Sequence, residues 1–454
     1  MGIEGASRRG FWSRLAARKS FWPCVALASL LLFNVFFTKG FHKTRLQPDP
    51  RNSVAVRVGA DIETATSWEA TVPEAGSYDV MLIYCCDEHR AGREHALAVG
   101  PTRFGWRTVK TASWDTPAER VVGSVRIETP GAVTVTLAPL DPGIQSRVRL
   151  EAVWLVGKWR LFGSMIDILH RGSIVMLLSI GMTLVIATAG IDLSVGSVMG
   201  IAGAIAGMIL RQETNGPVWA AIVLPLAAAL AAGLWNGVLV AFVRLQPIIA
   251  TLILLVAGRG IAQLVTEGQI PTFERPGFEY LGTGAFLALP FTISVVAIVA
   301  ALTLAVTKLT VAGLCIEAVG NNERASRLAG LRPWLVKLLV YAFSGLCAGV
   351  AGLIATADIK AADVNNCGLY LELDAILAVV IGGTPFSGGR ANVLGSLVGA
   401  LVMQTLTTMI LTRGVAPEQA FVVKALVVVA VCLLQSEKVR SAVTRRLRRR
   451  EAAP

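Results

Sequence analysis

Long apolar stretches separated by short polar connections occupy two parts of the chain. One lies near the start, at residues 21–38, and the others follow residue 161. A helix needs about 20 residues to cross a hydrocarbon core of about 30 Å, so the pattern predicts a mainly α, polytopic membrane protein with about ten transmembrane helices. The later runs lie near 165–189, 194–210, 218–243, 248–266, 291–307, 335–357, 371–384, 393–412 and 418–435.

Between these two parts the pattern changes to a period of two. Residues 45–158 contain short segments of alternating apolar and polar residues, separated by turn sequences such as PEAG, TPG and DPG. This pattern is typical of antiparallel strands with one buried face. We therefore predict an all-β sandwich inserted after the first helix. The expected strands include SVAVRV from Ser53, YDVMLIY from Tyr78, RVVGSVRIE from Arg120, AVTVTLAPL from Ala132 and RVRLEAVWLV from Arg147.

Composition and charge indicate the setting of these elements. The chain has 454 residues, 54% hydrophobic and 16% charged, with a mean hydropathy of +0.62, which excludes an ordinary soluble protein. The net charge of +12 is concentrated in basic tails at 1–20 and 437–454. By the positive-inside rule both termini are expected in the cytoplasm and the sandwich on the extracytoplasmic side. Neither tail belongs to a nucleic-acid-binding module, so no nucleic-acid partner is expected.

One polar connection within the membrane part at 161–436 stands out by its charge. Residues 308–334 carry several Lys and Arg and are expected in the cytoplasm. The segment NERASRLAGL contains good helix formers and precedes a proline. On such a helix Ala325, Leu328 and Ala329 share one side, while the charged residues project elsewhere. This amphipathic surface is suited to a soluble partner, and a solvated connector is the alternative.

The sequence GIDLSVGSVMG, residues 190–200, places an aspartate between two apolar runs. Asp192 is expected to cap the start of a broken helix, and direct contact with a transported ligand is the alternative. Ser194 and Ser197 are expected to satisfy freed backbone groups. Four glycines follow at helical spacing and predict a face that another helix approaches closely. They are Gly196, Gly200, Gly203 and Gly207.

A second glycine-rich interruption, GGTPFSGGRANVLG, follows residue 381. An offset of 195 residues matches Val185 with Val380 and Gly200 with Gly395, which indicates a weak internal duplication. Interrupted apolar segments in corresponding positions predict a translocation pathway. The residues predicted to line it are Gly190, Asp192, Ser194, Gly196, Gly382, Gly383, Ser387 and Gly388. Further intramembrane polar candidates are Arg259, Glu372, Asp374, Asn236 and Gln404.

The β region carries its own candidate residues. WEATVPEAGSYDVMLIYCC and VGSVRIETPGAVTVTLAPL resemble the carbohydrate-binding-module-type sandwiches attached to some glycosidases and sulfatases. Trp68, Trp106 and Trp114 are candidates for stacking on a sugar ring, and core packing is the alternative. Cys85 and Cys86 are adjacent and bridge each other poorly, so a disulfide from either to Cys367 is left open.

Three segments carry a family resemblance. GMTLVIATAGIDLSVGSVMG, EAVGNNERASRLAGL and AVVIGGTPFSGGRANVLGSLVGAL resemble the ribose and galactose type of ABC sugar permease, and AGRGIAQLVTEGQI resembles its galactofuranose-transporter-like branch. The resemblance implies a bacterial inner-membrane permease that forms a homodimer or heterodimer, docks a cytoplasmic ABC ATPase and receives a monosaccharide from an extracytoplasmic sugar-binding protein. It assigns ATPase coupling to Gly320, Asn321, Asn322, Glu323, Ala325, Arg327 and Gly330. The β insertion is absent from the typical member.

Enzyme chemistry has no support in the sequence. There is no GxxxxGK[ST] phosphate loop, no HExxH and no Gly-x-Ser-x-Gly elbow. The chain is therefore expected to be no enzyme and to hold no cofactor, with ATP used by a partner subunit. The alternative function is a membrane-anchored glycan sensor or binding protein that uses the β-sandwich. A coupling-type loop and ten helices favour the transporter.

Overall fold

A computed structural model describes residues 21–37, 164–412 and 422, together with most of 45–162. Within the last range it leaves out 49–52, 63–65, 74, 87–93, 110, 112–116, 140–147 and 158. The chain divides into two compact units, residues 44–162 and the remainder. Both basic tails, Trp114 and the predicted span 418–435 (apart from residue 422) lie outside the described residues.

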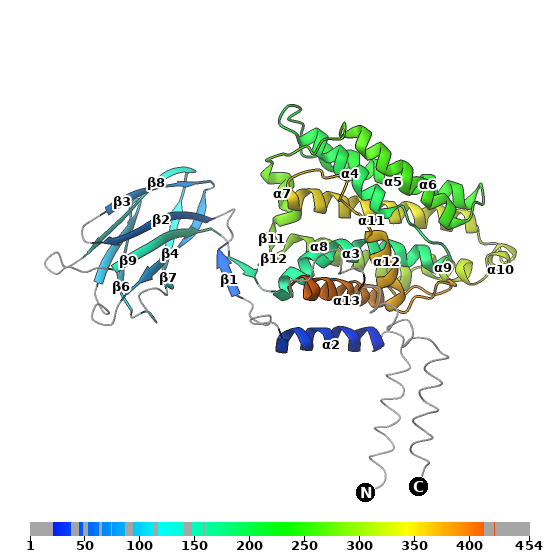
Figure 1. The fold of residues 1–454 in the computed structure, drawn as a ribbon, viewed down its shortest axis with the longest axis horizontal. Coiled ribbons are helices and arrows are strands. Elements are labelled where there is room, and N and C mark those ends of the chain that lie inside the picture. The colour runs from blue at the N-terminus through cyan, green and yellow to red at the C-terminus, as the bar shows by residue number, and fades with distance from the viewer. Residues whose placement is uncertain are drawn as a thin grey trace, which may run out of the picture. The chain divides into compact units, whose positions relative to one another are not determined.

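The smaller unit is built from two four-stranded antiparallel sheets (Figure 1). One sheet has the strand order β2-β9-β4-β7 and the other β3-β8-β5-β6, while β1 pairs with β10. The strands are β1 (Arg45–Pro48), β2 (Ser53–Ile62), β3 (Thr66–Val72), β4 (Gly76–Cys85), β5 (Glu94–Val99), β6 (Thr102–Arg107), β7 (Ala118–Ile127), β8 (Gly131–Pro139), β9 (Val148–Val156) and β10 (Trp159–Phe162).

The sandwich core follows from the alternation seen in the sequence. Val80 and Leu82 on β4 are fully buried, and they share one cluster with Leu97, Val135 and Leu137 of the other sheet. Since successive side chains of a strand point to opposite faces, one face of each sheet meets the other. The predicted β-rich region before the helices is confirmed.

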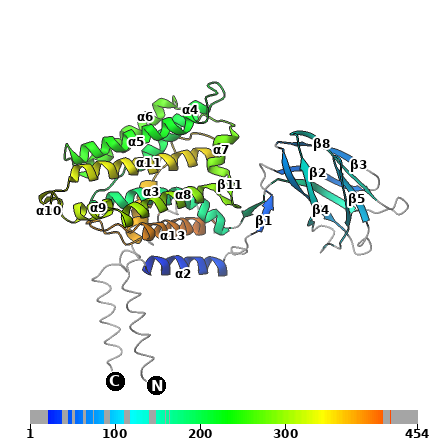
Figure 2. The same cartoon turned by 180° about the vertical axis from the view of Figure 1, so that it is seen from behind.

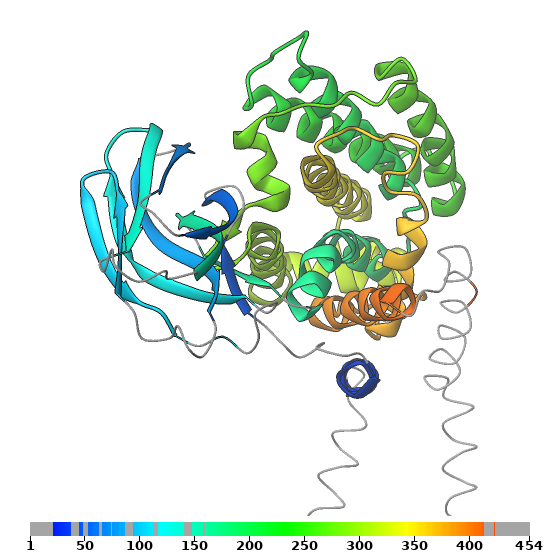
Figure 3. The ribbon, with the colours of Figure 1, turned by 60° about the vertical axis from the view of Figure 1, so that its left-hand side comes forward.

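The larger unit is helical (Figures 1 and 2). Its long helix α11 lies between α4 and α5 on one side and α3 on the other, and α2 lies beside α13 (Figure 3). The helices are α2 (Phe21–Phe37), α3 (Ser164–Ala187), α4 (Val195–Leu210), α5 (Ala220–Ala241), α6 (Pro247–Val265), α7 (Pro276–Thr283), α8 (Phe291–Leu309), α9 (Val311–Asn321), α10 (Glu323–Leu328), α11 (Pro333–Ile359), α12 (Leu371–Ile381) and α13 (Val393–Thr412); a short hairpin joins β11 (Ala285–Phe286) to β12 (Leu289–Pro290).

Six of the described helices are long and apolar enough to cross a membrane: α3, α5, α6, α8, α11 and α13. The α2 and α4 helices have 17 and 16 residues, and α12 has 11. The helical, membrane-spanning character of this part is confirmed, while the total of ten spans stays a prediction.

Close approach of α5 and α11 depends on glycines. A Cβ atom on Gly345 of α11 would lie 2.9 Å from Cα of Gly233 on α5, and one on Gly233 would lie 3.0 Å from Cα of Ala342. These neighbours are backbone atoms, which cannot rotate away as a side chain can. Small residues at such a crossing let the two helix backbones pack in van der Waals contact.

The glycine face of α4 has more varied neighbours than the sequence predicts. Gly203 faces Thr356 of α11, as expected for a helix contact. Gly196 and Gly207 instead face Gly368 and Ala362, in the connection between α11 and α12. The expectation of one approaching helix is therefore wrong for half of this face. The glycines make room for an irregular segment whose backbone enters the helical layer.

The Gly345→Ala variant tests the α5 and α11 contact. Alanine raises helix propensity by about 1 kcal/mol over glycine, but overpacking a tight contact costs about 1–3 kcal/mol. We expect Gly345→Ala to lower the thermal unfolding midpoint of the full chain in detergent. Gly260→Ala on α6 is the matched control, because a Cβ there meets nothing within 4 Å; it should leave the midpoint unchanged or raise it. Equal midpoints for the two variants would contradict the packing account.

Candidate functional site

The connection between α3 and α4 is held by the Asp192 carboxylate. Asp192 is 1% exposed. Its Oδ1 accepts hydrogen bonds from the Ser194 hydroxyl at 2.6 Å and the Ser194 amide at 3.1 Å. Its Oδ2 accepts from the Ser344 hydroxyl of α11 at 2.8 Å. The N-cap of α4 is Ser194, without a side-chain cap bond, so Asp192 stabilises the turn before the helix instead of capping it.

Two further side chains complete this network. Asn236 of α5 donates to the Ser194 hydroxyl oxygen at 2.8 Å. The Ser197 hydroxyl lies 2.8 Å from the Ser194 carbonyl and 3.0 Å from the Leu254 carbonyl of α6. The broken helix is therefore tied to α5, α6 and α11 through buried polar groups. These bonds satisfy most of the buried polar atoms of the interruption, whereas Asn236 Oδ1 has no partner among the described residues.

The connection between α12 and α13 is held by Asn392. Its Nδ2 donates to the Gly382 carbonyl at 2.7 Å, and its Oδ1 accepts from the Gly395 amide at 3.2 Å. Gly383 and Gly388 have φ angles of +89° and +77°, a backbone region that residues with a side chain rarely adopt. This interruption thus uses an amide side chain and glycines where the first uses a carboxylate.

The end of α9 touches both interruptions. A Cβ on Gly320 would overlap the Ala187 carbonyl, at the end of α3, and would lie 2.7 Å from the Gly389 amide. Gly389 itself donates to the Ala187 carbonyl at 2.9 Å. Glu317 of α9 accepts from the Ala391 amide at 3.2 Å. One short helix therefore contacts the end of α3 and the segment leading into α13.

The α10 helix follows directly and projects part of its surface. Asn322 caps it by accepting from the Ala325 amide at 3.0 Å. Glu323 accepts a 2.6 Å hydrogen bond from Lys337 of α11, which holds the pKa of its carboxyl below the ordinary value. Because a lowered pKa preserves the charged form, this bond persists at neutral pH and is lost only as the pH falls below the ordinary carboxyl range.

The outward side of α10 is partly apolar. Leu328 is 90% exposed, and Ala325 and Ala329 beside it are also exposed. Arg327 lies 3.4 Å from Glu323. The expected small apolar side is therefore present, but Glu323 serves to attach α10 to α11 and is less available than the sequence suggests. Gly330 ends the segment with a φ of +89°.

The predicted pathway residues fall into two groups. Gly190, Asp192, Ser194 and Gly196 are buried within the unit, with Gly190 facing the Tyr341 hydroxyl. In the second interruption Gly382 is buried, Gly383 and Gly388 are half-buried, and Ser387 is exposed. The two groups meet where Gly388 lies against Ala189 and Gly320. Sequence reasoning missed Ser344 and Asn392, both of which lie at the interruptions.

Among the other candidates, Arg259 and Asn236 have hydrogen-bond partners, whereas Glu372 Oε2 has none among the described residues. Arg259 donates to the Val364 and Cys367 carbonyls at 2.9 and 2.7 Å, which ties α6 to the connection before α12. Glu372 is 7% exposed and lies beside Gly196. Asn236 belongs to the Asp192 network.

Burial decides the role of the candidate tryptophans in the sandwich. Trp106 is 5% exposed, and its ring contacts Tyr84 and stacks on His95 at centroid distances of 4.8 and 5.2 Å. It packs in the core, which corrects its candidacy for sugar stacking. Trp68 packs at the edge of the same core. Cys85 and Cys86 are buried in the sandwich, and Cys367 is half-buried in the connection before α12. The disulfide left open by the sequence stays a prediction.

The sequence of the helical unit is similar to that of known proteins. The family described as branched-chain amino acid transport system / permease component matches residues 164–432. The chain belongs to this permease family. The galactofuranose transporter permease protein YtfT of Escherichia coli (strain K12) is 52% identical over 279 residues, covering 62% of this chain and 81% of that protein.

Two further relatives are also named as sugar import permeases. The fructose import permease protein FruF of Bifidobacterium longum is 41% identical, covering 64% of this chain and 82% of that protein. The ribose import permease protein RbsC of Escherichia coli (strain K12) is 37% identical, covering 61% and 86%. The relationship to the ribose and galactose type of ABC permease is confirmed, and the chain is a multi-pass membrane protein. Among solved structures, a ruminal GH26 endo-beta-1,4-mannanase matches 24% of this chain and 20% of its own at 16% identity and a TM-score of 0.18, which carries no argument.

The Ser344→Ala variant tests the Asp192 network in this permease. It leaves the buried carboxylate without one of its donors, which costs about 1–3 kcal/mol. Ser179→Ala on α3 is the matched control, because the Ser179 hydroxyl is equally buried but bonds only the Val175 carbonyl of its own helix. We expect a clearly lower thermal midpoint for Ser344→Ala alone, measured on the full chain in detergent. An unchanged midpoint would show that the network does not hold the interruption.

Proposed function

We propose that this chain is the permease subunit of an ABC importer and forms the membrane pathway for a monosaccharide, with ATP hydrolysis supplied by a partner ATPase. The observation that carries the proposal is the packing of Gly320 against the ends of both interrupted segments. A force applied to α9 and α10 from outside the unit acts directly on the Ala187 carbonyl and the Gly389 amide. A pathway whose opening depends on ATP hydrolysis in a separate subunit needs a contact of this kind between an exposed element and the interrupted segments.

The exposed side of α10 is the proposed docking surface for the ATPase. Leu328 offers an apolar contact, while Asn321, Asn322, Arg324 and Arg327 surround it with polar groups. An apolar centre with a polar rim is the usual composition of a protein interface. Glu323 takes a supporting role, because its bond to Lys337 fixes α10 on the end of α11.

The proposed substrate class rests on the relatives. YtfT, FruF and RbsC are named for galactofuranose, fructose and ribose, which are all neutral monosaccharides. The family description also names branched-chain amino acids, and an autoinducer 2 import permease of Salmonella choleraesuis is 32% identical. The higher identities favour a sugar, delivered by an extracytoplasmic sugar-binding protein to a homodimer or heterodimer of permeases.

The proposed orientation has support in chain order. The last strand of the sandwich ends at Phe162 and α3 begins at Ser164. The α3 helix has 24 residues, about 36 Å at 1.5 Å per residue, and its far end meets α9. In the chain, the sandwich is therefore followed directly by the end of α3 that does not meet α9. We place the sandwich outside the cytoplasm, and the α9–α10 element and both termini inside it.

Reconstituted uptake tests the substrate class. The full chain, reconstituted with a partner ABC ATPase and a sugar-binding protein, should import labelled D-galactose, D-ribose or D-fructose into proteoliposomes only when ATP is supplied on the ATPase side. Labelled L-leucine should not be imported under the same conditions. Leucine uptake without sugar uptake would overturn the proposed substrate class. ATP hydrolysis by the purified chain alone would overturn the division of labour between subunits.

The Leu328→Asp variant tests the docking surface. A charge in the apolar centre of an interface should reduce ATPase co-purification several-fold, because it stays unpaired there. Leu287→Asp is the matched control, since Leu287 is 82% exposed and lies between β11 and β12. Exposed substitutions change stability by about 0.5 kcal/mol or less, so both variants should fold. Normal co-purification of the ATPase with Leu328→Asp would contradict the docking surface and favour the alternative that α10 is a solvated connector.

A further inference from the structure

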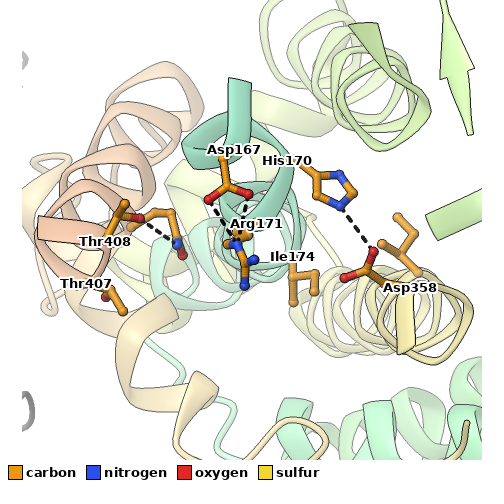
Figure 4. Close-up of a pocket in the computed structure, with 9 residues that line it drawn as sticks. Asp167, His170, Arg171, Ile174, Asp358, Thr407 and Thr408 are labelled. Carbon is orange, nitrogen blue, oxygen red and sulfur yellow. Dashed lines mark hydrogen bonds and ion pairs between the residues drawn. The ribbon is translucent and has the colours of Figure 1, made fainter. Parts of the chain in front are cut away.

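A cavity with several charged and polar side chains in its lining lies at one end of the helical unit, between α3, α11 and α13 (Figure 4). Its volume is about 530 Å³, which falls within the range of about 300–1,000 Å³ typical of small-molecule sites. Asp167 and His170 stand in the first two turns of α3, Asp358 in the last turn of α11, and Thr408 near the end of α13. The cavity is therefore at the end of α3 that lies opposite to α9.

The cavity lining alternates hydrogen-bond donors and acceptors. Arg171 binds both oxygens of Asp167 at 3.0 and 3.1 Å. His170 Nε2 lies 3.2 Å from Asp358, and its Nδ1 lies 3.1 Å from the Thr292 hydroxyl of α8. Because a carboxylate only accepts, His170 carries its proton on Nε2 toward Asp358. Gln404 and Thr408 add an amide and a hydroxyl on the facing helix.

These groups remain accessible despite their mutual bonds. The side chains of Asp167, Arg171 and Asp358 are 46%, 65% and 40% exposed, whereas His170 is 15% exposed. His170 is thus the positioning residue that joins α3, α8 and α11. The two carboxylates and the arginine keep surface for a ligand. Figure 4 shows Asp167 and Arg171 together on α3 and Asp358 on α11.

The charged side chains of the cavity lining favour some classes of ligand over others. The arginine in the lining is already paired with Asp167, and Asp358 is paired with His170. An anionic ligand would therefore meet two carboxylates without an uncompensated cation. A neutral polyhydroxylated ligand instead finds carboxylate acceptors for its hydroxyl protons and guanidinium, amide and hydroxyl donors for its oxygens. Ile174 and Ile354 add apolar wall beside these polar groups.

We propose that this cavity is a binding site for a neutral monosaccharide within a single permease chain, with Asp167, Arg171 and Asp358 as its hydrogen-bonding groups. The inference rests on the proposed function, because it names where the imported sugar first meets this chain. On the proposed orientation the cavity opens toward the extracytoplasmic side. The sugar would therefore be held here before the connections near Gly320 change.

Protection from cysteine labelling tests the site in an otherwise natural chain. Thr408→Cys places a thiol in the lining, and Ala329→Cys places one directly after α10 at the opposite end of the unit. The full chain in nanodiscs is treated with a water-soluble maleimide, with the natural chain as background. The probe is whichever of D-galactose, D-ribose or D-fructose the reconstituted transporter imports. We expect this sugar to slow labelling at residue 408 several-fold, without effect at residue 329 and without protection by L-leucine.

The outcomes separate this inference from the proposed function. Sugar uptake without protection at residue 408 overturns the cavity as a site and leaves the permease function standing. If the transporter imports none of the three sugars, the proposed function fails and the inference fails with it. Equal protection at residues 408 and 329 would indicate a global change, and it would also overturn the site.

A kinetic comparison gives a second readout. Arg171→Gln should raise the KM for uptake several-fold while the maximal rate is retained, because it removes a ligand contact at the exposed end of the cavity. Arg211→Gln is the matched control, since Arg211 forms a similar exposed pair with Glu213 outside this cavity. A fall in maximal rate alone, or equal effects of both variants, would contradict the assignment.

Discussion

Every polar backbone group freed inside a membrane must find a partner within the protein, and this constraint governs the helical unit. The connection between α3 and α4 meets it with Asp192, which is hydrogen-bonded to Ser194 and Ser344. Asn236 extends the bonding to α5. The interruption is therefore costly to rearrange unless several helices move together. An ionisable side chain is tolerated in this buried position because neighbouring residues supply its hydrogen-bond donors.

The second interruption obeys the same constraint with different side chains, and α9 contacts both interruptions. Asn392 closes the connection between α12 and α13, and the Gly389 amide reaches back to the Ala187 carbonyl at the end of α3. Gly320 fits against this junction because it has no side chain. Glu323 is bonded to Lys337, so α10 is attached to α11 while α9 contacts the two connections.

Sequence periodicity predicts the elements better than their contacts. Alternation over Tyr78 to Tyr84 is enough to predict β4, and the apolar runs locate the six long helices. Ser344 was missed because it lies in an uninterrupted apolar run 152 residues from Asp192, where no local pattern marks it. The α9 helix was missed because its residues were assigned to a polar connection, although Thr310 is a recognisable cap. The burial of Trp106 could not be predicted from the sequence either, because both core packing and sugar stacking are compatible with its position on a strand.

The central claim is that the α9–α10 element controls both interrupted segments together. Hydrogen exchange of the full permease, measured by mass spectrometry with and without the bound ATPase, tests it most directly. The account predicts that ATPase binding changes amide exchange in residues 188–194 and in residues 382–392, in addition to α10, while the sandwich strands are unaffected. A change confined to α10, with both connections unaltered, would contradict the account.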